Sequence, residues 1–350
     1  MSEGLAPPRK LSPDEERFCQ ELDINKAYFL GERVDGPSRE TRDPYSLVAS
    51  RPLSLGKPVA GQLEALELRR NLRFGNHIYA LANAYLVAEA LEVGEIIIPS
   101  HPLLRDEFTI QGVRFSQRDG DSDDKKSLVK LSGNYFFRYT LGHLLDEKVP
   151  TSVAFPLFAD ALRGFPRFCR DELFEWFMKG FAEKAKRFRR DLTIHIRSGD
   201  IFSGDGAHPS YWQPPLSFYL SVISRVEPRQ VTLVFEDRGN PVIDRIEQYL
   251  IKSGIRYRVK DGPIEEAIRE ILTARNLVVA RGTFSRPMVA MGRNLRNLYC
   301  YADDQGYGVL SRLDTAKFTL HVIDDPERAY EARVSPWQNS EEQRETMLTW

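Results

Sequence analysis

Cysteine is scarce in this chain of 350 residues, and its three cysteines are too widely separated to form a disulfide framework or a metal knuckle. The six histidines are scattered without the spacing of metal ligands. No apolar run reaches the roughly 18 residues that a membrane span requires, and the first residues contain no apolar signal-peptide core. The sequence therefore predicts a cytoplasmic protein with no metal site and no integral membrane segment.

An excess of charge of one sign is also missing, because the formal net charge is -1. A nearly neutral chain is not suited to coating nucleic acid, so we expect no nucleic-acid partner. The chain also lacks a G-x-x-x-x-G-K-[ST] phosphate loop, a G-x-G-x-x-G loop with a following acid, a G-x-S-x-G elbow and an H-E-x-x-H motif. Nothing in it is typical of a kinase, a dehydrogenase, an α/β-hydrolase or a zinc enzyme.

The most informative pattern that is present is DLTIHIRSGD at residues 191–200. Its apolar residues predict a short buried strand over 192–196 that ends in a turn. His195 and Arg197 point to the same side of this strand, where the guanidinium fork suits phosphate oxygens and the imidazole adds a donor. The alternative is a surface arginine next to a core histidine whose hydrogen bonds are satisfied.

The second half of the chain alternates regularly between strand and helix patterns. Strands are expected at 192–196, 231–235, 255–259, 277–280 and 298–301, and helices at 216–223, 242–250, 264–272 and 286–292. Such alternation predicts right-handed βαβ crossovers and a parallel, doubly wound sheet. The fold class is therefore α/β.

Two further loops follow strands of this sheet and should reach the same edge as Arg197. Glu236 and Asp237 come after the second strand, where a carboxylate binds ribose hydroxyls or purine N–H groups. Thr283, Phe284 and Ser285 come after the fourth strand, at a helix start that suits phosphate, with an aromatic ring for a base. The alternatives are a solvent-exposed acidic loop and an ordinary helix cap with Phe284 in the core.

The first half of the chain has one strong signal, a turn, helix and strand over residues 68–99. The turn at Arg73, Gly75 and Asn76 opens the helix. Its glycine lets backbone approach a ligand, and free N–H groups at a helix start favour anions. The alternative is a turn and an N-cap without a ligand. Ile96 to Ile98 form the buried strand.

Domain boundaries follow from these patterns. We expect an N-terminal arm over 1–60, a first Rossmann-like domain over 61–188, a second over 189–325 and a helical tail over 326–350 that folds back on the first domain. A further helix is expected over 172–187.

With these residues assembled, the chain resembles the GDP-fucose-dependent fucosyltransferases with an H-x-R-x-G motif, the group of protein O-fucosyltransferases and α1,2- and α1,6-fucosyltransferases. LRFGNHIYALANAYLVAEAL resembles their N-terminal turn and helix, HIRSGD their nucleotide-clamping motif, and ARGTFS their third motif. The match covers about 73–99 and 192–301. It implies a GT-B architecture, two Rossmann-like domains facing each other across a cleft.

The resemblance also implies roles for individual residues. Arg197 would bind the β-phosphate with help from His195. Thr283, Phe284 and Ser285 would contact phosphate and nucleoside. The ribose or guanine would be held by Glu236 or Asp237, whereas the family more often has paired aspartates there. Gly75 and Asn76, with Arg73 beside them, would close over the diphosphate or acceptor.

The implied function is inverting transfer of fucose from GDP-fucose to a glycan acceptor, without metal or another cofactor. Arg197 and Asn76 are the expected catalytic residues, with Asp200 or Asp205 as base and Glu236 as a weaker candidate. Residues 204–212 form either an acceptor-binding lid or a mobile loop fixed by Trp212. The alternatives are another nucleotide sugar as donor, or a nucleotide- or glycan-binding module without turnover. Relatives of the secretory pathway carry a signal or anchor and disulfides, which this sequence does not show.

Overall fold

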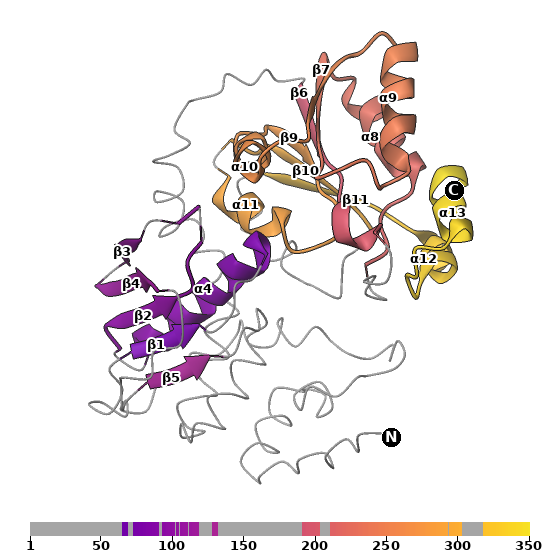
Figure 1. Ribbon diagram of the computed structural model, residues 1–350. Helices are drawn as coiled ribbons and strands as arrows, with labels where there is room; N and C mark the ends of the chain where they lie inside the picture. The colour runs from indigo at the N-terminus through magenta and orange to yellow at the C-terminus, as the bar shows by residue number, and fades with distance from the viewer. Residues whose placement is uncertain are drawn as a thin grey trace, which may run out of the picture. The chain divides into compact units, whose positions relative to one another are not determined.

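The computed structural model describes residues 65–68, 73–90, 93–101, 103–104, 106–110, 112–118, 128–131, 191–203, 211–292, 294–302 and 318–350. The chain divides into two compact units, residues 1–168 and 169–350. Each unit contains a sheet whose strands are mainly or wholly parallel (Figure 1). The predicted α/β class is therefore confirmed, while the arrangement of two domains across a cleft stays a prediction. The expected arm over 1–60 and helix over 172–187 lie outside the described residues.

The first unit is built on a sheet with the strand order β3-β4-β2-β1-β5. Its elements are β1 (Ala65–Leu68), α4 (Phe74–Ala90), β2 (Glu95–Ile98), β3 (Glu107–Ile110), β4 (Val113–Gln117) and β5 (Leu128–Leu131). The β3–β4 pair is antiparallel and the other pairs are parallel. Helix α4 packs on β1, β2 and β4, because Ile78, Leu81 and Tyr85 recur on one face and are buried.

The second unit has a six-stranded, wholly parallel sheet with the order β11-β10-β9-β6-β7-β8. Its strands are β6 (Asp191–His195), β7 (Gln230–Val234), β8 (Arg256–Lys260), β9 (Asn276–Val278), β10 (Asn297–Tyr301) and β11 (Thr319–Ile323). Numbered along this unit, the order is that of the Rossmann fold, 3-2-1-4-5-6. The predicted doubly wound sheet is therefore confirmed.

Helices cover both faces of this sheet (Figure 1). The pair α8 (Leu216–Val226) and α9 (Val242–Lys252) packs together on one face, and α10 (Ile264–Leu272) and α11 (Ser285–Met291) pack together on the other. In α8, Leu216 and Leu220 are only half-buried. The buried residues of this helix are Phe218, Tyr219, Val222 and Ile223.

The C-terminal helices are part of the second unit. After β11 come α12 (Ala329–Val334) and α13 (Glu341–Thr349), and α13 packs on α8 and α9. Tyr330 and Trp337 are fully buried in the same apolar core as the strands of this sheet. The tail therefore belongs to the second unit's core, which corrects the expectation that it folds back on the first domain.

Within the described ranges, no helix combines the length and apolar character needed to span a membrane. The same residues contain no group of three or more His, Cys, Asp or Glu side chains arranged to hold a metal ion.

Candidate functional site

The topology of the second sheet brings two distant loops together. Strands β6 and β9 are neighbours at the centre of the sheet, and the chain leaves them toward opposite sides of the strand order. In doubly wound sheets, ligands bind outside the carboxyl ends of the strands at this switch point. The loop after β6 carries Arg197 and Asp200, and the loop after β9 carries residues 281–285.

Arg197 is mostly buried, with 16% of its side chain exposed. Its Nη2 atom lies 3.3 Å from Asp200 Oδ1, and its guanidinium lies 5.0 Å from the centre of the Tyr211 ring. Its Nε has no hydrogen-bond partner among the described residues. This burial does not fit the alternative of a surface arginine. An arginine with one long ion pair and an unused buried N–H keeps donors for an anion.

Gly282 makes the space that the Arg197 side chain occupies. Its φ is +139°, a conformation that residues with a side chain rarely adopt. A Cβ atom at this position would lie 2.7 Å from Arg197 Nη1. The loop after β9 therefore approaches the guanidinium closely because it has a glycine here.

His195 ends β6 and is buried beside Phe284, with ring centres 5.3 Å apart. Its Nδ1 has no hydrogen-bond partner in the described part of the chain, so the alternative of a satisfied core histidine does not hold. Burial, and next the charge of Arg197, lower the pKa of His195 to about 3. The imidazole is therefore neutral at physiological pH and offers one N–H donor.

This lowered pKa predicts acid sensitivity. The unfolded chain takes up a proton at His195 near the ordinary pKa of 6.5, whereas the folded chain does so only near pH 3. Folding stability is therefore retained above about pH 6.5 and lost as the pH falls toward 3. Between about pH 7.5 and 5.5 the loss from this group is about 1.4 kcal/mol. In urea unfolding experiments, the free energy of unfolding of His195→Gln should fall by about 1.4 kcal/mol less between these two pH values than that of the unmodified protein. An equal fall in both proteins would contradict the prediction.

Ser285 and its neighbours form the rest of the loop after β9. The Ser285 hydroxyl is buried and has no partner among the residues that the structure describes. The residue at the N-cap of α11 is Phe284, and no side chain caps this helix, so the alternative of a hydroxyl cap is wrong. Thr283 and Phe284 are half-buried. Since α11 is only seven residues long, its N-terminus adds less to anion binding than the sequence suggested.

The loop after β7 mainly holds the loop after β6 in shape. Asp237 Oδ1 accepts hydrogen bonds from the Ser198 hydroxyl and from the backbone N–H groups of Gly199 and Gly239, the latter two at 3.2 and 2.8 Å. These bonds outweigh the opposing effect of desolvation and lower the pKa of Asp237. Asn240 Nδ2 also donates to the Arg197 carbonyl at 2.9 Å.

Glu236 precedes Asp237 in this turn, and both side chains are exposed. Gly199 has a φ of +73°, and a Cβ atom there would collide with the Glu236 carboxylate. Both carboxylates therefore lie against the turn after β6, Asp237 through hydrogen bonds and Glu236 over Gly199. The sequence alone treated the two as equivalent.

Two aromatic residues before α8 contact both arginines of this edge. Tyr211 lies against Arg197, and the Trp212 ring lies 3.8 Å from the guanidinium carbon of Arg281. Trp212 is buried and part of the core. Residues 204–210 lie outside the described ranges, so both expectations for the loop over 204–212 stay predictions. Arg281 was not singled out from the sequence. The signal was its position directly after a buried strand, but an aromatic partner that is 69 residues away is not visible in a local pattern.

In the first unit, the predicted residues lie at the start of α4. Arg73 is exposed, and its carbonyl accepts the backbone N–H of His77 at 2.9 Å. Gly75 and Asn76 lie inside the first helical turn, not in a turn before it, so Asn76 is not the N-cap. The units are placed independently, and whether these residues contact a ligand bound to the second unit stays a prediction. Asp205 lies outside the described residues.

His77 was missed in the sequence and is unusual. It is buried, with neither ring nitrogen hydrogen-bonded to any described residue, and its ring stacks on His101 at 4.8 Å. Burial, followed by the nearby His101, lowers its pKa to about 3. The sequence signal was a histidine on the apolar face of an amphipathic helix.

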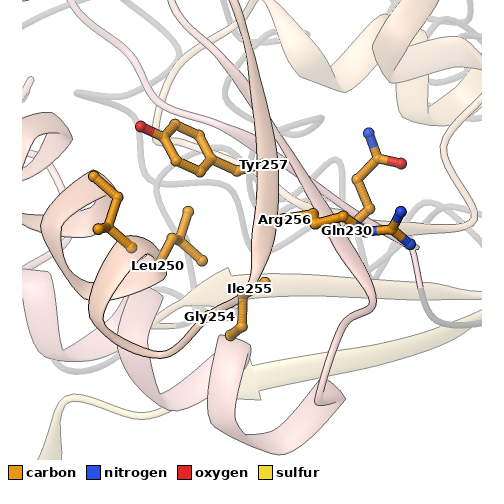
Figure 2. A pocket seen from close by; sticks show the side chains of 7 residues that line it. Gln230, Leu250, Gly254, Ile255, Arg256 and Tyr257 are labelled. Atoms are coloured by element: carbon orange, nitrogen blue, oxygen red, sulfur yellow. The ribbon is translucent and has the colours of Figure 1, made fainter.

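A separate hollow of about 440 Å³ lies at the amino ends of β7 and β8 (Figure 2). It is lined by Gln230, Leu250, Ile251, Gly254, Ile255, Arg256 and Tyr257. Ligands of doubly wound sheets bind at the opposite, carboxyl ends of the strands. This hollow is therefore separate from the site around Arg197.

The similarity of this chain to known proteins is distant. No family model matches the chain, and no curated protein matches it. A variant of Arabidopsis thaliana FUT1 in complex with GDP is similar at 13% identity and a TM-score of 0.38, over 85% of this chain and 82% of that one. POFUT1 in complex with GDP-fucose is similar at 11% identity and a TM-score of 0.38, over 67% of this chain and 93% of that one.

The third structure is E. coli ADP-heptose LPS heptosyltransferase II, at 11% identity and a TM-score of 0.39, over 81% of this chain and 98% of that one. Similarity at these identities and TM-scores carries no argument about function.

Proposed function

We propose that this chain is a GT-B glycosyltransferase of the inverting type that transfers fucose from GDP-fucose to a glycan or glycoconjugate. The observation that carries the proposal is Arg197, a mostly buried arginine with an unused buried N–H at the switch point of a parallel sheet. The choice of GDP-fucose comes from the motif resemblance of residues 73–99 and 192–301.

The phosphates of the donor would meet three groups of this edge. Arg197 supplies the charge, and exchanging its Asp200 contact for phosphate costs little because Asp200 is 36% exposed. The neutral His195 imidazole supplies a hydrogen-bond donor, and the buried Ser285 hydroxyl, with no other partner in the described ranges, supplies another. Thr283 lies in the same loop and is the fourth proposed contact.

The nucleoside would lie toward β7. Glu236 follows the second strand of the Rossmann order, where an acidic residue takes ribose hydroxyls in dinucleotide-binding sheets. Phe284 offers an aromatic face for the base. Asp237 supports the turn under Glu236, so we assign the nucleoside contact to Glu236.

The chemistry follows from the charge on the leaving group. Cleavage of the bond between sugar C1 and the diphosphate oxygen sends the bonding electrons to the diphosphate. The acceptor hydroxyl oxygen bonds to C1 from the opposite face and gives its proton to the carboxylate base, for which Asp200 and Asp205 are the proposed candidates. Arg197 stabilises this developing charge from a preformed, mostly buried position. Asn76, Gly75 and Arg73 of the first unit would contact the diphosphate or the acceptor.

Isothermal titration calorimetry with GDP, followed by a panel of GDP- and UDP-sugars with a glycan acceptor library, tests this function. We expect GDP to bind in the micromolar range and GDP-fucose to be the donor that is consumed. Turnover of a different nucleotide sugar would show that this sugar, and not GDP-fucose, is the donor. Binding of GDP without turnover of any donor would favour the nucleotide-binding module. Failure to bind any nucleoside diphosphate would refute the proposal.

A further inference from the structure

The C-terminal segment, residues 326–350, reaches the proposed anion site through three side chains that donate to backbone carbonyls. Tyr330 Oη donates to the Gln213 carbonyl at 2.7 Å, Trp337 Nε1 to the Ile201 carbonyl at 2.9 Å, and Arg344 Nη2 to the Phe202 carbonyl at 3.0 Å. We propose that this segment positions the arginines of the site, so that Tyr330, Trp337 and Arg344 are positioning residues. The inference rests on the proposed function.

The three carbonyls lie at the points where movement would displace the arginines. Ile201 ends the 3-10 turn that contains Asp200, the ion-pair partner of Arg197, and Phe202 follows that turn. Gln213 directly follows Tyr211 and Trp212, whose rings contact Arg197 and Arg281. The C-terminal segment therefore holds the chain on both sides of residues 204–210.

Gln213 passes this restraint on to the loop after β9. It is fully buried, and its side-chain amide donates to the Arg281 carbonyl at 3.2 Å as well as to the carbonyls of Tyr211 and Trp212. Tyr330 thus fixes the backbone of the residue whose side chain fixes Arg281. A single buried hydroxyl links the tail to the loops that follow both central strands.

Loss of the hydrogen bond from Tyr330 to the Gln213 carbonyl should be enough to affect ligand binding. Loss of this bond leaves a buried carbonyl without its donor, and the desolvation of that carbonyl is then no longer compensated. An anion site depends on donors held in place before the ligand arrives, so small movements of both guanidinium groups should weaken ligand binding.

The test compares two tyrosines that differ in this one respect. Tyr330→Phe removes the bond to Gln213, whereas Tyr219→Phe removes a hydroxyl that is equally buried but has no hydrogen-bond partner among the described residues. We expect Tyr330→Phe to weaken GDP binding about 5- to 10-fold and Tyr219→Phe to leave it unchanged. Both are measured by calorimetry at a temperature at which circular dichroism shows each variant fully folded.

Hydrogen–deuterium exchange provides a readout that does not depend on the ligand. Tyr330→Phe should speed amide exchange in 197–203, 211–215 and 281–285 and leave 230–260 as in the unmodified protein. Arg344→Met, which keeps an apolar stem but loses the bond to Phe202, should speed exchange in 197–203.

The outcomes separate the two proposals. Absence of GDP binding by the unmodified protein refutes the proposed function, while faster exchange confined to the three loops still supports the positioning role. Exchange in Tyr330→Phe equal to that in Tyr219→Phe would overturn the positioning role, as would equal GDP affinity of these two variants when the unmodified protein binds GDP.

Discussion

Replacement of Arg197 by alanine should weaken GDP binding by about 30- to 100-fold and lower the transfer rate by about 100- to 1000-fold. The guanidinium is the mostly buried cation at the switch point, and its removal leaves the diphosphate without its strongest partner. The effect on rate exceeds the effect on affinity because negative charge on the leaving group grows in the transition state. Calorimetry with GDP and initial rates with GDP-fucose measure the two effects.

Two companion variants make this result specific. Arg197→Lys keeps the charge but loses the planar fork, so its affinity should fall between those of the unmodified protein and the alanine variant. Arg245 on α9 is exposed, and its Nη1 donates to Gln248 Oε1 at 3.3 Å. Arg245→Ala should therefore bind GDP normally. Unchanged affinity in Arg197→Ala would remove the basis of the proposed function.

Replacement of Gly282 by alanine should weaken GDP binding by about 10-fold or more, although the new methyl group carries no charge. At φ +139°, a side chain is strained, and the Cβ atom would lie 2.7 Å from Arg197 Nη1. The guanidinium must then move away from the loop after β9. The measurement is calorimetry with GDP, together with the thermal unfolding midpoint.

Gly254 provides the matched control. It also has a positive φ, +66°, but no atom lies within 4 Å of a Cβ built on it. Gly254→Ala should therefore lower stability by about 1 kcal/mol and leave GDP affinity unchanged. Equal GDP affinities for the two alanine variants would show that Gly282 does not control the position of Arg197.

The sequence predicted most of the second unit because its elements have strong local patterns. The bounds of α10 were predicted to the residue, and β6 was predicted within one residue at each end, since buried parallel strands are short apolar runs. Strand β11 was missed because its burial is only intermediate or exposed. In the first unit, β2 was predicted, but β3 alternates between exposed and buried residues and was not singled out.

The site was predictable only as a set of loops at one edge. His195, Arg197, Glu236 and Ser285 follow strands, and topology alone brings their loops to one side of the sheet. The structural role of Asp237 depends on hydrogen bonds from Ser198 and Gly199, which are 39 and 38 residues away in the sequence. The bond between Tyr330 and Gln213 spans 117 residues, and no local pattern encodes such a contact.

The central location of β6 and β9 has a consequence for local opening of the fold. Strands β8 and β11 form the two borders of this sheet among the described residues, and border strands separate from a sheet more readily than strands with neighbours on both sides. Fraying at either border would leave Arg197 and Gly282 in contact. The proposed nucleotide binding should therefore persist when a border strand separates from the sheet and be lost only when β6 and β9 separate.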